Sequence, residues 1–599
     1  MIRVADYIIK RIADEGVKHV FYIPGGQCVY LADALRRNED IKPISVHHEQ
    51  AAAMAALTYS LYNENFGACL VTTGCAGTNT ITGVLHAWQD SIPCIFVSGQ
   101  QNYAQTIEAS GLPLRQVGIQ EADIVGLVRP ITKYSVMLKN PAEIVYEIDK
   151  AIYFAREGRP GPVWIDVPLD IQNMMIEESD QIRFRPDVKK LEVKTADIEY
   201  ARRVLKDAKR PVILAGEGVR RAHAQESLRD FAEKNRIPVL FTRFASDIFP
   251  YEHELNFGVV GAGGAHRNAN FTVQNADCVL SIGCRLSTEV IGGNKDEFAR
   301  EAKVIVVDID AVEHAKKGAK IDRFIHLDAK DFLDRIGEET IGTDTSQWID
   351  KCNHWKEVFP WYPADSDKAE HLNIRYFLSK LSERFPKNTA VTADAGLTGA
   401  ITAGSLKLKE GMRVLSSIAQ GEMGYALPGA FGAAELNGSM VVAVCGDGSV
   451  MMNLQELQTL VRNNYNIKVI IVDNNGYSGV RHGQKAHFRG KSIGTDPSNG
   501  IDFPDYEKVA QAFGIESVHI HGVSDMDAGI ERIVADDKPL VCVVDCDPEQ
   551  VDLHAGLVTY GKRKFGFRPL EDFAPFVDRD LFFSEMIVKP TETSYGTPV

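Results

Sequence analysis

Length, composition and charge already exclude several classes of protein. The chain has 599 residues, of which 45% are apolar and 25% are charged, and its formal net charge is −15. This length predicts about three domains of ordinary size, and the acidic balance argues against nucleic acid or a membrane surface as a partner. No run approaches the ~18 apolar residues of a membrane span, and the first residues, Met1 to Lys18, lack the apolar centre of a signal peptide.

The cysteines indicate a reducing compartment. None of the ten forms a CxxC pair or a zinc-type spacing. Cys445 and Cys542 stand in Val-rich runs and are predicted to be buried core thiols. We therefore expect a cytoplasmic protein without a metal cluster.

Residues 1–180 predict a first doubly wound α/β domain. Short apolar runs predict strands, and each is followed by a turn and a helical pattern. One such turn is Pro24-Gly25-Gly26, and another leads through His48-Glu49-Gln50 into an Ala-rich helix. A lone Glu at the start of a helix usually only stabilises the helix N-terminus. The residue type of Glu49 alone therefore does not indicate a catalytic role.

A charged linker is expected at 181–195, and a second α/β domain is expected at 190–345. One of its strands is followed by Gly216-Glu217-Gly218. A lone GxG is a weak nucleotide signal, and a plain strand-to-helix turn fits it equally well. Two later strands end at residues 283–285 and 308–310.

The third domain is expected at 371–556, and a tail of charged and aromatic residues follows at 557–599. Three positions are open for the tail: over the active site, on a neighbouring subunit, or along the surface as a strap. Within the third domain two buried strands flank a helical pattern, which Asn453 and Glu456 are predicted to cap.

Polar residues follow both of these strands. Gly446-Asp447-Gly448-Ser449 comes after the first and Asn474-Asn475-Gly476 after the second. In a parallel sheet both strand ends lie at the edge where ligands bind. A carboxylate and an amide there suit Mg2+, and glycines with a helix N-terminus suit a diphosphate. The alternative is that both motifs are ordinary turns.

The stretch from GDG to NN closely resembles the diphosphate motif of thiamine-diphosphate enzymes, and within them it is similar to the acetolactate synthase group of pyruvate carboligases. The resemblance covers nearly the whole chain. It implies three doubly wound parallel-sheet α/β domains. These are an N-terminal pyrimidine-binding domain, a central domain and a C-terminal diphosphate-binding domain. It also implies that Mg2+ is held by Asp447, Asn475 and the backbone carbonyl of Tyr477.

The resemblance also assigns residues around the organic cofactor. HHEQAAAMAA is similar to the segment in which these enzymes place one indispensable carboxylate, so Glu49 is expected to give a proton to N1′ of the aminopyrimidine. Met423 is expected to hold the cofactor in a bent shape. The other positions implied to contact thiamine diphosphate are Gly25, Gly26, Gln120, Gly396, Gly421, Gly448, Ser449 and Gly479.

In the acetolactate synthases the central domain binds FAD. Arg285, Asp308 and Asp328 match positions that contact FAD there, whereas the loop at 261–265 matches only loosely. Other thiamine decarboxylases carry the same domain without flavin, so FAD stays open at this point.

The sequence departs from the acetolactate synthases at the expected acceptor pocket. Where they have an Arg that holds the carboxylate of the second 2-oxo acid, this chain has Glu289. Ile119, Leu169 and Val480 replace a Phe, a Lys and a Met. These changes predict a pocket less suited to a small anionic acceptor. The alternative is that Arg481 or another Arg takes over.

Together these features predict a cytoplasmic, thiamine-diphosphate- and Mg2+-dependent carboligase that decarboxylates a 2-oxo acid, with pyruvate expected, in the manner of acetolactate synthase. The resemblance implies a homodimer or homotetramer whose active site lies at the subunit interface. Three alternatives are a carboligase with a keto-sugar acceptor, a simple 2-oxo acid decarboxylase, and a catalytically silent flavin- or nucleotide-binding subunit. The last has no need for Glu49, Met423, Asp447 and Asn475 together.

Overall fold

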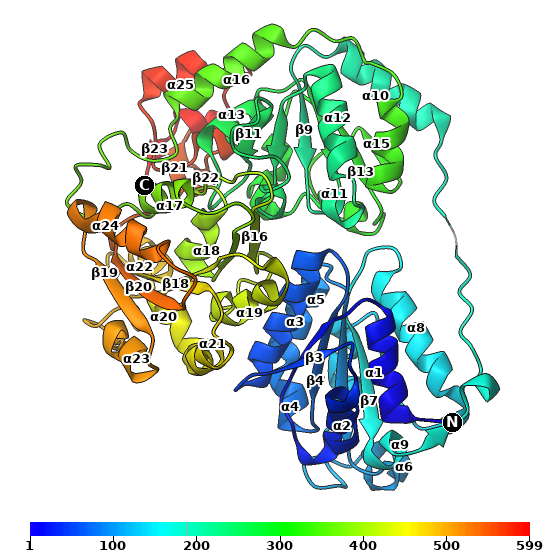
Figure 1. Ribbon diagram of the computed structural model, residues 1–599. Helices are drawn as coiled ribbons and strands as arrows, with labels where there is room; N and C mark the ends of the chain where they lie inside the picture. The colour runs from blue at the N-terminus through cyan, green and yellow to red at the C-terminus, as the bar shows by residue number, and fades with distance from the viewer. Residues whose placement is uncertain (189, 563) are drawn as a thin grey trace.

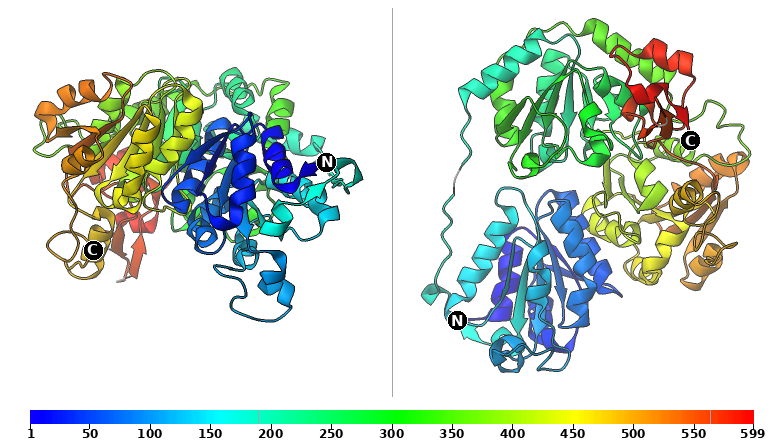
Figure 2. Two further views of the ribbon diagram at one scale, coloured as in Figure 1. Left: turned by 60° about the horizontal axis from the view of Figure 1, so that its bottom comes forward. Right: turned by 180° about the vertical axis from the view of Figure 1, so that it is seen from behind.

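Three six-stranded parallel sheets organise the chain in the computed structural model (Figure 1). The structure describes residues 1–188, 190–562 and 564–599. Helices cover both faces of each sheet, so the predicted class of three doubly wound α/β domains is confirmed (Figures 1 and 2). No helix among the described residues is both long and apolar enough to cross a membrane.

The N-terminal sheet has the strand order β3-β2-β4-β5-β7-β6, all parallel. Its strands are β2 (His19–Tyr22), β3 (Lys42–Ser45), β4 (Gly67–Val71), β5 (Cys94–Gln100), β6 (Tyr134–Met137) and β7 (Val163–Pro168). Its helices are α1 (Val4–Asp14), α2 (Val29–Arg37), α3 (Glu49–Asn63), α4 (Cys75–Asn79), α5 (Ile81–Gln89), α6 (Ile107–Ser110), α7 (Ile124–Val128), α8 (Ile144–Arg156) and α9 (Leu169–Gln172). A small antiparallel pair joins β1 (Ile2–Arg3) to β8 (Met175–Ile176).

The C-terminal sheet repeats this strand order as β16-β15-β17-β18-β20-β19. Its strands are β15 (Ala390–Ala393), β16 (Arg413–Ser416), β17 (Val441–Gly446), β18 (Ile467–Asp473), β19 (Glu516–Ile520) and β20 (Leu540–Asp545). Its helices are α17 (Ile374–Glu383), α18 (Gly396–Thr402), α19 (Ala426–Asn437), α20 (Asp447–Val450), α21 (Leu457–Asn463), α22 (Ser478–His487), α23 (Tyr506–Ala512) and α24 (Val523–Ile533). The Val-rich runs form its central strands because both faces of the sheet are covered; Cys445 and Cys542 are fully buried there.

The central sheet has a different order, β11-β10-β9-β12-β13-β14. Its strands are β9 (Pro211–Ala215), β10 (Val239–Phe241), β11 (Asn256–Val259), β12 (Cys278–Ile282), β13 (Lys303–Asp308) and β14 (Arg323–His326). Its helices are α10 (Thr195–Asp207), α11 (Gly218–Arg221), α12 (Gln225–Asn235), α13 (Arg267–Gln274), α14 (Thr288–Ile291), α15 (Ala329–Gly337) and α16 (Ser346–Val358). In chain order this is 3-2-1-4-5-6, the order of dinucleotide-binding folds.

The tail returns to the central domain. It forms a three-stranded sheet of β21 (Leu557–Tyr560), β22 (Lys564–Phe567) and β23 (Thr597–Pro598), together with α25 (Arg579–Glu585). Phe582 is fully buried against Phe271, and Glu585 accepts hydrogen bonds from Lys351 and Trp355. Of the three positions left open for the tail, the structure places it as a strap on the central domain of its own chain (Figure 1).

The N-terminal and C-terminal domains meet through α3 and α19. Both helices are built mainly from small residues, and the interior of α3 is completely buried. A Cβ atom at Gly432 would clash with the carbonyl oxygen of Ala55, so the two backbones touch. The hydroxyl groups of Thr58 and Tyr425 hydrogen-bond across the contact at 2.7 Å.

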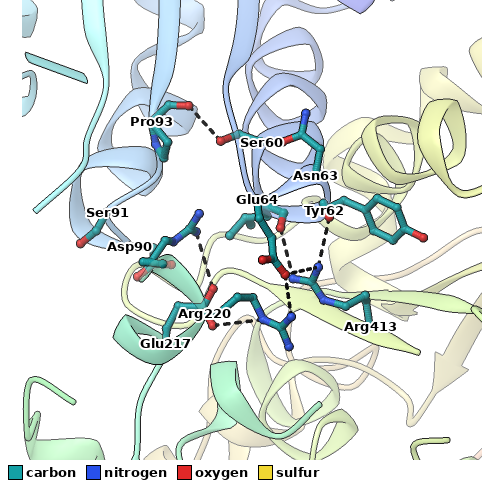
Figure 3. Close-up of polar contacts among 12 residues, drawn as sticks. Ser60, Tyr62, Asn63, Glu64, Asp90, Ser91, Pro93, Glu217, Arg220 and Arg413 are labelled. Carbon is teal, nitrogen blue, oxygen red and sulfur yellow. Dashed lines mark hydrogen bonds and ion pairs between the residues drawn. The ribbon is translucent and has the colours of Figure 1, made fainter. Parts of the chain in front are cut away.

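A buried ion cluster joins all three domains at the end of α3. Glu64 accepts from Arg220 at 2.7 Å and lies 3.4 Å from Arg413 (Figure 3). Both arginines also pair with Asp247, at 2.5 and 3.0 Å. Glu64 comes from the N-terminal domain, Arg220 and Asp247 from the central one, and Arg413 from β16. The cluster therefore fixes the three domains relative to one another.

Candidate active site

Asp447 lies where the strand order of the C-terminal sheet reverses, between β15 and β17. Ligands bind open α/β sheets at such points. Its two carboxylate oxygens accept the backbone N–H groups of Gly448 and Gly476, each at 2.7 Å. The loops after β17 and β18 therefore meet, and Asp447 holds them together.

Asp447 is a buried carboxylate whose charge no cation of the described residues compensates. It is 3% exposed, and no Lys, Arg or His among the described residues pairs with it. Burial, aided by the nearby charge of Asp473, raises the pKa of Asp447 to about 7. An uncompensated carboxylate of this kind fits a bound divalent cation, which would favour its charged form. A side chain at Gly448 would overlap the ring of Tyr477, so only glycine fits beside Asp447.

The second loop has a rigid support. Asn475 has a left-handed backbone with φ of 57°, and its side chain is exposed. Arg481 is buried and donates to the carbonyl oxygens of Asn474, Asn475 and Pro548. The suggestion that Arg481 replaces the missing acceptor arginine is therefore wrong, because its guanidinium holds this loop. The carbonyl of Tyr477 accepts one hydrogen bond, from the backbone N–H of Arg481 at 2.8 Å, and keeps a lone pair.

The remaining residues expected near the diphosphate lie around this edge. Ser449 is buried in α20, two residues after Asp447. Gly396 begins α18, which follows β15, and Gly479 lies exposed in the first turn of α22.

Glu49 stands at the corresponding edge of the N-terminal sheet. It is the first residue of α3, is half-buried and accepts a hydrogen bond from Asn79 Nδ2 at 2.9 Å. The sequence does not by itself identify Asn79, which ends the Gly-containing stretch Thr72-Thr73-Gly74-Cys75-Ala76-Gly77-Thr78-Asn79 and is the last residue of α4. Gly25 lies against Thr72, and Gly74 lies against the carbonyl of Gln120. The predicted Gly25–Gly26 and Gln120 segments therefore border the same strand-order reversal, between β2 and β4.

The two edges approach each other within one chain. Asn453 Nδ2 donates to the side chain of Gln50 at 3.2 Å and to the carbonyl of Gly424 at 2.8 Å. These partners are the direct neighbours of Glu49 and Met423. Glu456 accepts the backbone N–H of His47 at 3.0 Å. The prediction that Asn453 and Glu456 cap a helix is wrong, because α21 begins at Leu457 and both side chains reach the other domain.

A buried histidine anchors the loop that carries Gly421 and Met423. His86 of α5 hydrogen-bonds Glu422 at 2.5 Å and lies 3.2 Å from Asp90. Burial opposes the charge on the ring, but these two carboxylates outweigh it and raise the pKa of His86 to about 10. The loop is therefore tied to the N-terminal domain by an ion pair between groups that are almost inaccessible to solvent.

A cavity of about 390 Å3 lies at the edge of the central sheet, where its order reverses between β9 and β12. Arg285, Asp308 and Asp328 all line it, so the structure brings the three expected flavin contacts together. The sequence did not single out Arg221, which also lines the cavity and leaves two guanidinium nitrogens without a hydrogen-bond partner among the described residues. Arg159 enters the cavity from the N-terminal domain.

The expected acceptor residues do not come together. Glu289 lines the central cavity and forms an ion pair with Arg243. Burial raises the pKa of Glu289 although Arg243 opposes this. Ile119 is 80% exposed and Val480 is 55% exposed. Neither of these two side chains lines this cavity, and Leu169 begins α9.

Comparison with known proteins matches each domain to a family. Residues 2–127 match the family described as thiamine pyrophosphate enzyme, N-terminal TPP binding domain. Residues 198–336 match the central domain of these enzymes, and residues 394–544 match their C-terminal TPP binding domain.

The same family appears among curated relatives over nearly the full chain. The acetolactate synthase large subunit of Cyanidium caldarium is 31% identical over 90% of this chain and 92% of its own length. The acetolactate synthase large subunit of Corynebacterium glutamicum is 32% identical over 90% of this chain and 86% of its own length. The acetolactate synthase isozyme 1 large subunit of Escherichia coli is 30% identical over 91% of this chain and 94% of its own length. The chain belongs to the thiamine pyrophosphate enzymes and, among them, to the family of the acetolactate synthase large subunits.

The His86–Glu422 pair predicts a pH-dependent stability. Because folding raises the pKa of His86 from 6.5 to about 10, the pair stabilises the fold fully below pH 6.5 and loses this effect as pH rises through 10. His86→Gln should therefore lower the free energy of unfolding by about 3 kcal/mol at pH 6.5, and the deficit should shrink towards pH 10. Thermal unfolding at both pH values measures this, with the exposed His371→Gln as control; an equal deficit at both values would contradict it.

Proposed function

We propose that this chain is a thiamine-diphosphate- and Mg2+-dependent carboligase that decarboxylates a 2-oxo acid, with pyruvate as the expected donor, in the manner of acetolactate synthase. The observation that carries the proposal is Asp447, a buried carboxylate at the strand-order reversal that pairs with no cation in the described part of the chain. Asp447, Asn475 and the Tyr477 carbonyl would hold Mg2+, and the diphosphate would lie at the start of α20, beside Ser449. The free cysteines of the described residues suit a reducing, cytoplasmic location.

The chain's own residues would hold the cofactor in position and exchange a proton with it. When bound, the thiamine supplies the carbon chemistry that decarboxylation and ligation require. Asn79 fixes the carboxyl group of Glu49, which would exchange a proton at N1′ of the aminopyrimidine. The neighbours of Met423 are held in place, since Glu422 binds His86 and Gly424 binds Asn453, so Met423 would give the cofactor a firm apolar support.

Glu49→Gln tests this assignment. It keeps the size and the contact with Asn79 but cannot exchange the proton, so cofactor affinity should be retained while kcat falls by about 10²–10⁴-fold. Asp447→Ala, in contrast, should lose the Mg2+-dependent affinity for the cofactor. Calorimetric binding and CO2 release from pyruvate separate the two. Normal turnover in Glu49→Gln, or unchanged cofactor affinity in Asp447→Ala, would contradict the site as drawn.

We also propose a homo-oligomer whose active site combines Glu49 of one subunit with Asp447 of another. Exposed apolar side chains on the N-terminal domain near Gln120 and on the C-terminal domain beside the diphosphate loops support an interface there. These are Leu112, Leu114, Val117 and Ile119 on the first domain and Val480, Phe488 and Ile493 on the second. The Gln50–Asn453–Gly424 contacts favour the alternative that one chain supplies both halves.

Mixing the two inactive variants decides between these arrangements. If sites are shared, co-expressed Glu49→Gln and Asp447→Ala chains form hybrid dimers in which one site carries neither substitution. About a quarter of the wild-type activity should then return. If one chain forms a whole site, every site carries a substitution and the mixture stays inactive.

We further propose that the central cavity takes FAD. Two observations on the sheet support an adenine dinucleotide: the strand order 3-2-1-4-5-6 and the position of the cavity at its reversal. Arg221 supports a diphosphate, because two of its guanidinium nitrogens form no hydrogen bond among the described residues, and the nearest carboxylate, Glu217, lies 3.7 Å away. Protein incubated with FAD and freed of excess cofactor should then show the blue absorption band of a flavin. Arg221→Met should bind FAD about 10–100-fold more weakly, as expected for a lost charged contact. A protein that stays colourless overturns the proposal.

Glu289 favours a second candidate function, ligation to an acceptor other than a 2-oxo acid. Arg243 is the cation that pairs directly with Glu289 and is neutralised by it, so this arginine is not free to bind the carboxylate of a small 2-oxo acid. A neutral, hydroxylated carbonyl such as a keto-sugar unit fits such a pair better, because both groups can hydrogen-bond hydroxyls.

Glu289→Gln should free Arg243 and raise the formation of acetolactate from pyruvate alone, by roughly tenfold or more for a new charged contact. Product analysis by chromatography measures it, and Glu297→Gln, which changes a carboxyl group outside the cavity lining, is the control. Wild-type acetolactate formation at ordinary enzyme rates, about 10 s⁻¹, would refute the altered acceptor and leave acetolactate synthesis as the function.

A further inference from the structure

A second cavity, of about 640 Å3, lies between the central and C-terminal domains. Its walls come from β10 and β11, from residues 353–364 and from residues 403–408. It shares no lining residue with the central cavity and contains none of the residues assigned to thiamine, Mg2+ or flavin. Its volume lies in the range of small-molecule sites, and the reaction proposed above makes no use of it.

Lys356 of α16 gives this cavity an unpaired cation. Its ammonium group lies 4.1 Å from the centre of the Phe257 ring, and no carboxylate among the described residues forms an ion pair with it. Burial lowers the pKa of Lys356 to about 8, so the group is still mainly charged at pH 7. A partly desolvated cation without a counter-charge favours an anionic ligand.

The other charges near the cavity are already compensated or exposed. Lys407 is paired with Glu383 at 2.5 Å, and Glu254 is paired with Arg236 at 3.1 Å. Glu252 is exposed to solvent. His266 is neutral, since its Nδ1 accepts the backbone N–H of Val259, and burial together with Arg375 lowers its pKa to about 3. Lys356 is therefore the distinctive charge of the site.

Aromatic side chains form much of the remaining wall. Trp361 stacks on His266 with ring centres 4.3 Å apart and planes 12° from parallel. Tyr251 meets Trp361 edge-on at 5.0 Å, and Tyr362 and Phe257 also line the cavity. Such rings favour a flat aromatic partner over a flexible aliphatic one.

We propose that this cavity is a binding site for a small aromatic carboxylate, whose carboxylate pairs with Lys356 and whose ring packs among Trp361, Tyr251 and Phe257. Because the walls belong to two domains, an occupant would also hold the central and C-terminal domains together. Binding that is selective for the folded protein then raises its thermal stability.

Calorimetry on the full chain with 2-naphthoate tests the proposal, beside its neutral analogue 2-naphthylmethanol and the non-aromatic cyclohexanecarboxylate. We expect 2-naphthoate to bind at millimolar concentration or below, to raise the melting temperature and to bind more tightly than either analogue. Lys356→Met should weaken it about 10–100-fold, and Lys356→Arg should largely retain it. Lys387→Met, which removes an exposed lysine of the C-terminal domain, is the matched control and should bind normally.

Three results would overturn the proposal: no binding of 2-naphthoate to the wild type, equal binding by the neutral analogue, or unchanged affinity in Lys356→Met. Since Lys356 forms no ion pair among the described residues and a methionine can keep packing on the Phe257 ring, Lys356→Met is expected to fold, and its circular dichroism spectrum checks this. If it does not fold, Trp361→Leu provides the second test; it should weaken 2-naphthoate more than cyclohexanecarboxylate, and equal loss for both ligands counts against the site.

Discussion

The packing of α3 against α19 is the contact on which the arrangement of this molecule depends. It is close because small residues line both helices and Gly432 lets the backbones touch. At one end of α3 the contact brings Glu49 towards the Met423 loop through Asn453. At its other end Glu64 enters the ion cluster with Arg220 and Arg413 (Figure 3). A larger side chain at Gly432 would therefore disturb both the site geometry and the joint between the domains.

Buried carboxylates in this molecule differ in their surroundings. Some are paired with arginines and have a structural role, whereas Asp447 is not paired with a cation of the described residues. Asp247 and Glu64 each meet two arginines, and their pKa values are lowered because these charges outweigh burial. Asp447 meets only backbone N–H groups, and its pKa is raised. The paired carboxylates hold the domains together, whereas the charge of Asp447 is not compensated by any Lys, Arg or His among the described residues.

The sequence predicted the fold class because Val-rich runs, glycine turns and helical patterns are local signals that tertiary packing reinforces. It also placed Asp447 and Asn475 at one sheet edge, since a single βαβ unit determines that geometry. The errors fell where partners are distant in sequence. Asn453 and Glu456 bind the N-terminal domain instead of capping α21, and Arg481 binds loop carbonyls. No local pattern reveals that His86 pairs with Glu422 or that Arg243 pairs with Glu289.

The shared strand order of the N-terminal and C-terminal sheets has a consequence for internal symmetry. In each domain the helix at the contact, α3 or α19, follows the second strand of that sheet. The two domains are thus equivalent halves that meet through equivalent surfaces, as in a twofold pair made from one polypeptide. Their chemistry is not equivalent, because one half carries Glu49 and the other carries Asp447. A symmetric scaffold of this kind lets two copies of one architecture carry different side chains at equivalent sheet edges, and both copies match thiamine pyrophosphate binding domains.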